Sequence, residues 1–219
     1  MGTRRKESDL AYSVKEVFYT LQGEGYHSGR AAVFCRFAGC NLWSGREEDR
    51  AAATCTFCDT DFVGVDGDGG GKFATAKELA DHVASFWPED SERGRFVVCT
   101  GGEPLLQLDE ELIAEFHRVG FTIAIETNGT IAAPEGIDWI CMSPKHGAEL
   151  KLTAGNEIKV VFPQGTEPRV YEGLGFDHYF IQAMDGPKQA ENLKAAVQFC
   201  MENPKWRLSL QTHKLLQIR

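Results

Sequence analysis

Short apolar runs alternate with helical segments along most of the chain, and this alternation limits the fold more than any other feature. Strands that alternate with helices pack as a parallel sheet with right-handed crossovers. There are too few strand–helix units to close an eight-stranded barrel. The chain is therefore predicted to be an α/β protein with a partial, open parallel β/α barrel. The predicted strands, rich in Val, Ile and Phe, are Val14–Tyr19, Ala31–Phe37, Phe96–Thr100, Phe121–Glu126, Trp139–Ser143, Glu157–Phe162, Tyr179–Gln182 and Arg207–Gln211.

Helices are expected between these strands. Thr75 and Glu78 form a capping box, which predicts a helix that runs to about Trp87. Asp109 begins a second helix, and Gly120 ends it by adopting the left-handed conformation. A glycine-rich segment over 65–71 is predicted to be a flexible surface loop. In the last helix, residues three and four apart form the stripe expected to be buried: Leu193, Ala196, Val197, Cys200 and Met201.

Three cysteines form a C-x14-C-x2-C pattern, at Cys40, Cys55 and Cys58. Three thiolates around a four-iron cube leave one iron without a protein ligand, and an open iron can do chemistry. From spacing alone, a zinc site completed by His27 is an equal alternative. Disulfides are disfavoured, because the cysteine count of seven is odd and Met1–Leu10 is charged, unlike a signal sequence. The other cysteines lie in apolar patterns and are expected to be buried core residues: Cys35, Cys99, Cys141 and Cys200.

Composition favours a single soluble domain over residues 1–219. With 42% hydrophobic and 25% charged residues, the chain can bury a substantial core. No apolar run reaches the length of a membrane span. The net charge of −9 disfavours a nucleic-acid partner. The sequence therefore predicts a cytoplasmic protein that acts on a small molecule or a protein.

Polar clusters follow the carboxyl ends of the predicted strands. Active sites of parallel sheets lie at these ends, so clusters that recur on one rim predict one shared pocket. The clusters are Thr100–Pro104, Glu126–Gly129, Ser143–Lys145, Gln182–Asp185 and Gln211–His213.

Taken with the cysteines, these segments resemble the radical S-adenosylmethionine superfamily, and within it the 7-carboxy-7-deazaguanine synthase family. The superfamily likeness lies in the cysteine set, with Phe57 before the last cysteine, and in Gly101–Pro104. The commonest superfamily spacing is C-x3-C-x2-C, and the expanded loop here, over about 40–58, is a variant known in this family. The family likeness lies in Phe18–Gly25, Arg36–Trp43, Cys58–Thr60, Ser143–Lys145 and Gln211–Lys214.

The resemblance implies a [4Fe–4S] cluster whose open iron is chelated by S-adenosylmethionine. The resulting 5′-deoxyadenosyl radical would remove hydrogen from C6 of 6-carboxy-5,6,7,8-tetrahydropterin. The ring would contract with loss of ammonia to give 7-carboxy-7-deazaguanine, on the route to queuosine, and the cofactor would be regenerated. The resemblance also implies Mg²⁺, a reductant protein such as flavodoxin or ferredoxin, and a homodimer.

Roles for individual residues follow from the same resemblance. Cys40, Cys55 and Cys58 would ligate the cluster, and Thr60 would bind magnesium. S-adenosylmethionine would be contacted by Phe57, Cys58, Asp59, Gly102, Glu103, Ser143, Pro144, Lys145, Gln182, Ala183, Met184 and Asp185. The substrate would be contacted by Leu21, Gln22, Gly23, Arg36, Thr100 and Arg219, with Glu24, Glu126, Asn128 and His213 as further neighbours.

Structural roles remain alternatives at several of these positions. Arg36 could form an ion pair within its strand, Glu126 and Asn128 could close a turn, and His213 could be solvated. Thr60 could cap the turn after the cysteines. Two other functions also stay open: activation of a glycyl-radical enzyme, and a non-catalytic zinc or electron-transfer module.

Overall fold

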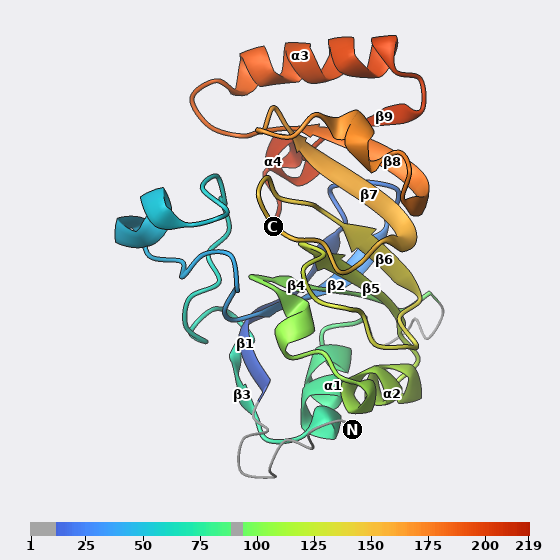
Figure 1. Ribbon diagram of the computed structural model, residues 1–219. Helices are drawn as coiled ribbons and strands as arrows, with labels where there is room; N and C mark the ends of the chain where they lie inside the picture. Colours follow the sequence, from blue (N-terminus) through green and yellow to red (C-terminus); the bar gives the residue numbers. More distant parts are fainter. Residues whose placement is uncertain (1–11, 89–93) are drawn as a thin grey trace.

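A computed structural model describes residues 12–88 and 94–219 of the chain, so the charged Met1–Leu10 segment lies outside the described residues. The described strands form one nine-stranded sheet in the order β3-β1-β2-β4-β5-β6-β7-β8-β9 (Figure 1). Neighbours from β2 to β9 are parallel. The strands are β1 (Tyr12–Leu21), β2 (Ala31–Phe37), β3 (Gly71–Phe73), β4 (Phe96–Gly101), β5 (Thr122–Thr127), β6 (Trp139–Met142), β7 (Ala154–Phe162), β8 (Gly175–Ala183) and β9 (Trp206–Ser209).

The sheet is open, with β3 and β9 at its edges, which confirms the predicted partial barrel. Two features were not predicted. The short strand β3 adds to the edge, and β1 runs antiparallel to both β2 and β3. The connection from β1 to β2 is too short for the crossover that parallel neighbours require, and Gln22 N donates to Arg30 O (2.8 Å) across it.

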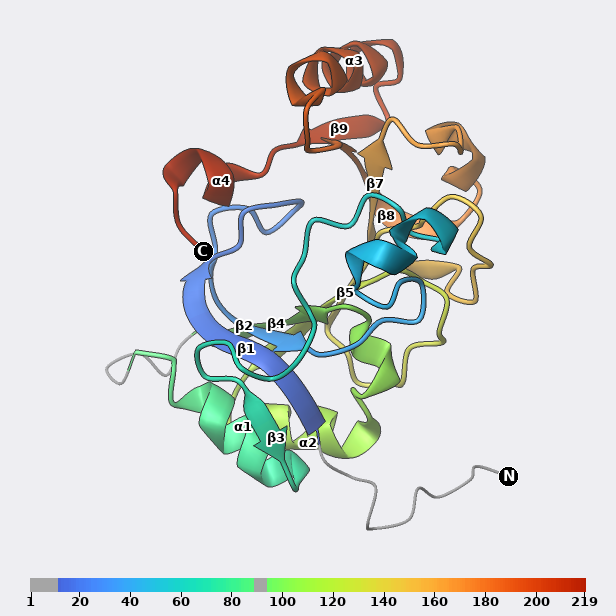
Figure 2. The same ribbon diagram turned by 90° about the vertical axis from the view of Figure 1, so that its left-hand side faces the viewer.

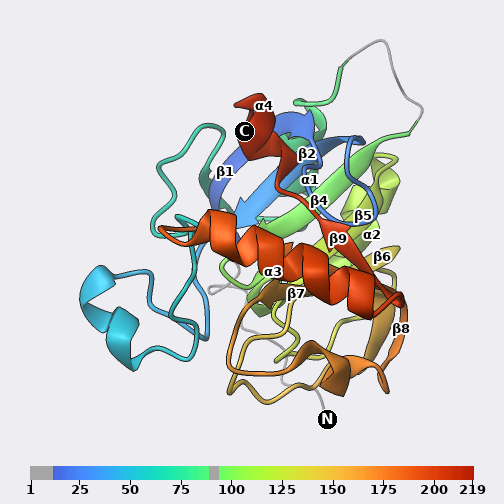
Figure 3. The same cartoon turned by 90° about the horizontal axis from the view of Figure 1, so that it is seen from above.

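Three helices cover the outer face of the sheet, α1 (Ala76–Ala84), α2 (Glu110–Arg118) and α3 (Gln189–Glu202). Figures 1 and 3 show α1 and α2 together at one end of the sheet and α3 over the other end. The predicted caps are present: Thr75 Oγ1 accepts from Glu78 N (3.1 Å), and Asp109 Oδ1 accepts from Leu112 N (3.0 Å). Gly120 has a φ of 85°, which satisfies the predicted helix end.

The predicted buried stripe of α3 is wrong in part. Ala196 is buried, but Val197 is 38% and Met201 is 73% exposed. Cys200 packs against the core around β7 and β8 as predicted, Leu193 is half-buried, and Phe199, which the prediction left out, also packs there. The amide of Asn192 donates to Met184 O (2.9 Å) and ties the start of the helix to the end of β8.

The glycine-rich segment over 65–71 is tied to β1. Gly67 N donates to Lys15 O (2.9 Å), and Val17 N donates to Asp68 O (2.8 Å). The segment runs directly into β3, so part of its backbone hydrogen-bonds to the edge of the sheet and not to solvent alone. The last helix, α4 (Thr212–Leu216), brings the carboxyl terminus beside β1, as Figure 2 shows.

Alternation along the strands separates an apolar outer face from a polar inner face. In β2, Val33, Cys35 and Phe37 enter the core beneath α1 and α2, while Arg36 points to the opposite side. The same alternation turns one charged or polar residue from each of several strands inward. Within the described residues, no helix is long and apolar enough to cross a membrane.

Candidate active site

The carboxyl ends of the parallel strands open into a cavity of about 420 Å³. It collects residues from segments that are far apart in the sequence. Of the predicted site residues, Glu103 and Pro144 do not line it. The others do: Leu21, Gln22, Gly23, Glu24, Arg36, Cys40, Cys55, Phe57, Cys58, Asp59, Thr60, Thr100, Gly102, Glu126, Asn128, Ser143, Lys145, Gln182, Ala183, Met184, Asp185, His213 and Arg219.

The three cysteines of the expanded loop share one wall of this cavity. Cys55 is buried, while Cys40 and Cys58 are half-buried. A hydrogen bond from Cys55 lowers the pKa of the Cys58 thiol to about 6, and the same bond raises the pKa of Cys55. Burial raises the pKa of Cys40. The thiolate is the form of cysteine that binds iron.

Arg50 holds the expanded loop in a defined shape. Its guanidinium donates to Thr56 O (3.2 Å) and Cys58 O (3.0 Å). It also stacks 4.0 Å above the ring of Trp43, which is 8% exposed. Figure 1 shows the loop projecting from the body of the sheet, with the short 3-10 helix Glu47–Ala52 at its tip. The long insertion between the first two cysteines therefore has its own contacts, which fix the backbone around Cys58.

Two observations show that this wall suits a negatively charged iron–sulfur cluster. Lys145 is half-buried, its ammonium donates to Ser143 O and Ser143 Oγ (both 2.7 Å), and the groups that act on it electrostatically include the thiols of Cys55 and Cys58. No described carboxylate forms an ion pair with it. Burial lowers the pKa of Lys145. An added anion among the thiols would give this lysine the partner that it lacks.

The second observation concerns Gly102. A Cβ at this position would lie 2.0 Å from Gly39 O and 2.8 Å from Cys40 Cβ, so only glycine lets the turn after β4 approach the first cysteine. Among the described residues, no three His, Cys, Asp or Glu side chains converge on a single metal ion. The thiols of a four-iron cube each bind a different iron and so stand apart.

His27 does not join the cysteines. Its ring lies 4.3 Å from that of Trp139 and 4.9 Å from that of Phe96, in an aromatic group outside the large cavity. Burial lowers the pKa of His27 to about 4. The zinc site with His27 as fourth ligand is therefore not formed.

The side chain of Glu103 has a structural role, which leaves only its backbone for the predicted contact with the cofactor. Its side chain is fully buried and accepts from Thr127 Oγ1 (2.7 Å), Asn128 N (2.8 Å) and Leu105 N (3.0 Å). These bonds join the end of β4 to the end of β5. Pro144 is buried, while its neighbours Ser143 and Lys145 reach the cavity.

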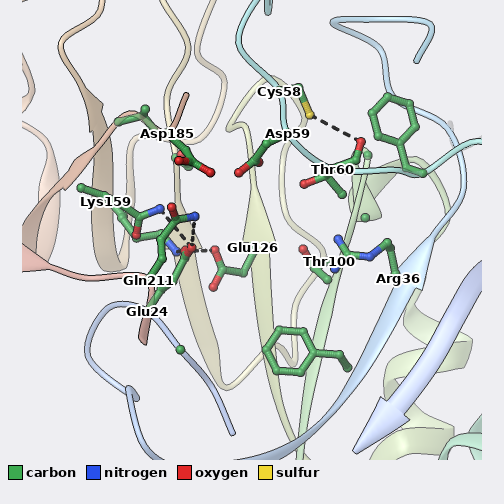
Figure 4. Close-up of a pocket in the computed structure, with 18 of the residues that line it drawn as sticks. Glu24, Arg36, Cys58, Asp59, Thr60, Thr100, Glu126, Lys159, Asp185 and Gln211 are labelled. Atoms are coloured by element: carbon green, nitrogen blue, oxygen red, sulfur yellow. Dashed lines mark hydrogen bonds and ion pairs between the residues drawn. The ribbon is translucent and has the colours of Figure 1, made fainter. Parts of the chain in front are cut away.

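One end of the cavity is cationic. Arg36 donates through Nε to Glu16 (2.8 Å), and no other described group takes its remaining donors. Arg219 donates to Asp68 (2.8 Å) and to Glu16 (3.4 Å), and its carbonyl accepts from Thr20 Oγ1 (2.8 Å). The ion pair expected as the structural alternative for Arg36 is therefore present. The guanidinium of Arg36 nevertheless lines the cavity, with Thr100 beside it (Figure 4).

The opposite end carries carboxylates around a buried lysine (Figure 4). Lys159 lies 2.5 Å from Glu24 and 2.8 Å from Glu126. Burial alone would raise the pKa of Glu24, but the charge and hydrogen bond of Lys159 and the amide of Gln211 outweigh it and lower that pKa to about 2. Burial likewise would lower the pKa of Lys159, yet Glu126 and Glu24 raise it well above its ordinary value.

Lys159 is a site residue that the sequence did not indicate, and Lys214 is one that lies in the Gln211–Lys214 motif but was given no role there. Lys159 was hidden in a strand taken to be apolar, although a charged residue between Ile158 and Val160 was an available signal. Lys214 lies in α4, where it forms ion pairs with Asp59 (2.7 Å) and Asp185 (2.5 Å). His213 packs against Gly23, where a Cβ would lie 2.2 Å from its Nδ1, and burial lowers the pKa of this histidine.

Comparisons with known proteins agree with this geometry. Residues 50–176 match the Radical SAM superfamily. The 7-carboxy-7-deazaguanine synthase of Bradyrhizobium diazoefficiens is 60% identical over 211 residues, which cover 96% of this chain and 100% of that protein. The enzyme of the same name from Bordetella pertussis is 62% identical, over 95% of this chain and 100% of its own length. The crystal structure of QueE from Escherichia coli has a TM-score of 0.68 at 22% identity, over 94% of this chain and 98% of that one, and supports the fold alone.

Proposed function

Because the chain belongs to the 7-carboxy-7-deazaguanine synthase family of the radical S-adenosylmethionine superfamily, we propose that 6-carboxy-5,6,7,8-tetrahydropterin is converted in its large cavity. The enzyme is a carbon–nitrogen lyase that contracts the pterin ring, releases ammonia and forms 7-carboxy-7-deazaguanine, for queuosine biosynthesis. When bound, the [4Fe–4S] cluster and S-adenosylmethionine supply a radical that removes hydrogen from C6 of the substrate. The observation that carries the proposal is that three thiols, the unpaired Lys145 and Arg36 line one cavity.

We assign the cluster to Cys40, Cys55 and Cys58. Lys145 would balance the charge of the thiolates and the cluster. S-adenosylmethionine would lie between the cluster, Gly102 and the segment Gln182–Asp185, because these line the cavity next to the cysteine wall. Phe57, Asp59 and Ser143 would complete this pocket. Gly102 and Glu103 would meet the methionine amino group through backbone carbonyls, while the carboxylate of Glu103 holds the turn.

The substrate would lie deeper, between the two ends of the cavity. Its carboxylate would bind Arg36, because a guanidinium can donate two parallel hydrogen bonds to a carboxylate. Thr100, Arg219 and the segment Leu21–Gly23 would contact the ring system, with Glu24, Glu126, Asn128 and His213 as its neighbours. This orientation excludes water from C6 and holds it toward the cofactor.

A magnesium ion would bind beside the substrate carboxylate, with the hydroxyl of Thr60 as one ligand. Thr60 lines the cavity, and Figure 4 shows its side chain between Cys58 and Arg36. Magnesium takes oxygen ligands and completes its octahedron with waters and substrate oxygens. A single neutral hydroxyl makes a site that fills only when substrate is present.

We also propose that the chain is one domain, acts as a homodimer, and receives electrons from a protein such as flavodoxin or ferredoxin. The continuous nine-stranded sheet supports one domain. A cytoplasmic location is supported by the seven cysteines, all of which are free.

The test is an anaerobic incubation with the carboxytetrahydropterin, S-adenosylmethionine, Mg²⁺ and a reductant, followed by mass analysis. Formation of 7-carboxy-7-deazaguanine is expected. Protein that carries an intact cluster and cleaves S-adenosylmethionine but leaves the pterin unchanged would contradict the proposed function.

A further inference from the structure

Lys159 occupies a position that the proposed chemistry does not yet use. Its ammonium projects from the inner face of β7 between Glu24, in the loop after β1, and Glu126, near the end of β5. The lysine side chain is only 3% exposed, and the two carboxylates are 17% and 19% exposed. One buried cation therefore holds together three segments that meet at the same end of the cavity (Figure 4).

The two carboxylates differ in how much of their hydrogen-bonding capacity the protein uses. Glu24 Oε1 accepts from the amides of Gln182 and Gln211 (both 3.0 Å), and its Oε2 accepts from Lys159. Glu126 Oε1 accepts only from the amide of Gln22 (3.1 Å), and its Oε2 accepts from Lys159 and, more distantly, from Cys141. An ionised carboxylate offers about four acceptor sites. Each carboxylate accepts three hydrogen bonds, but those to Glu24 come from two amides and an ammonium, while one of those to Glu126 is the long contact of 3.8 Å from the Cys141 thiol. Glu126 therefore keeps more acceptor capacity for a ligand than Glu24.

Charge separates the two ends of the cavity. Arg36 and Arg219 lie at one end and share one carboxylate, that of Glu16, while at the other end two carboxylates share one ammonium. A pterin with a carboxylate on C6 has matching ends, because its 2-amino group and N3–H form a donor edge on the far side of the ring system. A ligand of this kind fits the cavity in one orientation.

We propose that Lys159 is a positioning residue that keeps Glu126 ionised and in place. Glu126 then accepts hydrogen bonds from the 2-amino group and N3–H of the substrate. The inference rests on the proposed pterin substrate and extends it. Without Lys159, two carboxylates would face each other in a buried site and share a proton. A protonated carboxyl group loses acceptor capacity and gains a donor, which no longer matches the pterin edge.

The test compares two stable ligands that differ only at this edge, pterin-6-carboxylate and lumazine-6-carboxylate, which carries an oxygen in place of the 2-amino group. Binding is measured with the reconstituted protein in the presence of S-adenosylmethionine. Wild type is expected to prefer the pterin by about tenfold or more, since hydrogen bonds to charged groups are worth that much. In Lys159→Met the preference is expected to fall below about threefold, and Lys159→Arg is expected to restore part of it.

If Lys159 had a purely structural role, Lys159→Met would lower the affinity for both ligands by the same factor and leave the ratio of the two affinities unchanged. That result would overturn the inference. Lys151→Met, a substitution of an exposed lysine outside the cavity, is the matched control and should keep the wild-type ratio. If Lys159→Met does not fold, Glu126→Gln provides the test, because it removes the carboxylate itself. Loss of the preference for the pterin would support the inference, and a wild-type ratio of affinities would overturn it. Failure of wild type to bind either ligand would instead contradict the proposed function.

Discussion

Lys214 forms an ion pair of 2.7 Å with Asp59, the residue that directly follows the third cysteine of the cluster loop. The same ammonium lies 2.5 Å from Asp185, just beyond β8. Both aspartates line the cavity in the region assigned to S-adenosylmethionine. The carboxyl-terminal helix therefore joins two walls of the cofactor pocket that no strand connects directly.

Lys214→Met should weaken the binding of S-adenosylmethionine by about threefold to tenfold, because the two walls lose their common partner while the cluster ligands stay in place. The effect is limited by the partial exposure of the pair, since exposed ion pairs contribute about 1 kcal/mol or less. Calorimetric titration of reconstituted protein measures it. Lys194→Met, on the exposed side of α3, is the control. Equal affinities in wild type and Lys214→Met would refute the role.

Alanine at Cys40, Cys55 or Cys58 should abolish assembly of the cluster, because each thiolate is the sole protein ligand of one iron. Cys200→Ala should retain the wild-type iron content, since Cys200 lies in α3 and packs against the core around β7 and β8, away from the cavity. Iron and sulfide analysis with visible spectra of anaerobically prepared protein distinguishes the two groups. An intact cluster with full turnover in any of the three variants would show that the ligand assignment is wrong.

Thr60→Val keeps the shape of the side chain and removes its oxygen. The variant should keep its iron content and its affinity for S-adenosylmethionine but lose most of the stimulation of turnover by Mg²⁺. Initial rates over a magnesium titration measure this. A wild-type magnesium response would leave Thr60 with the alternative role of capping the turn after Cys58.

The Lys159–Glu24 pair should contribute to stability at neutral pH. Charge and hydrogen bonding lower the pKa of Glu24 from its ordinary 4.5 to about 2, so the contribution is complete above about pH 4.5 and is lost as the pH falls toward 2. Glu24→Gln should therefore show a smaller fall in the free energy of unfolding than wild type over this range. Denaturant titrations at several acidic pH values measure it, with the exposed Glu47→Gln as control. Parallel curves for wild type and Glu24→Gln would contradict the prediction.

Much of the architecture could be predicted because local pattern and overall fold agree. Strand-forming runs, the caps at Thr75 and Asp109, and the turn at Gly120 all point to the same strand–helix alternation. The antiparallel direction of β1 was not predicted. The connection between its end and Ala31 is too short for a crossover, and this length was an available signal. The face of α3 was predicted in part: Ala196 and Cys200 pack inward, while Val197 and Met201 are exposed.

The site was predictable where polar residues follow strands and less so where charge is buried inside a strand. Cys58, Arg36 and Gln182 stand in segments that the sequence marks out. Lys159 carries no such mark, because its importance comes from Glu24 and Glu126, which only the fold brings to it. The motif around Glu103 predicted contact with the cofactor, but only the fold shows that its carboxylate binds Thr127 and Asn128 and so leaves the backbone for such a contact.

The most direct test of the central claim follows a deuterium atom from C6 of the substrate. If the cavity holds C6 against the radical and S-adenosylmethionine is regenerated, deuterium should appear in recovered S-adenosylmethionine as 7-carboxy-7-deazaguanine accumulates, and methionine should not rise in proportion to product. Mass analysis of cofactor and product from one anaerobic incubation gives both quantities. Stoichiometric release of methionine with no deuterium in the cofactor would contradict the account.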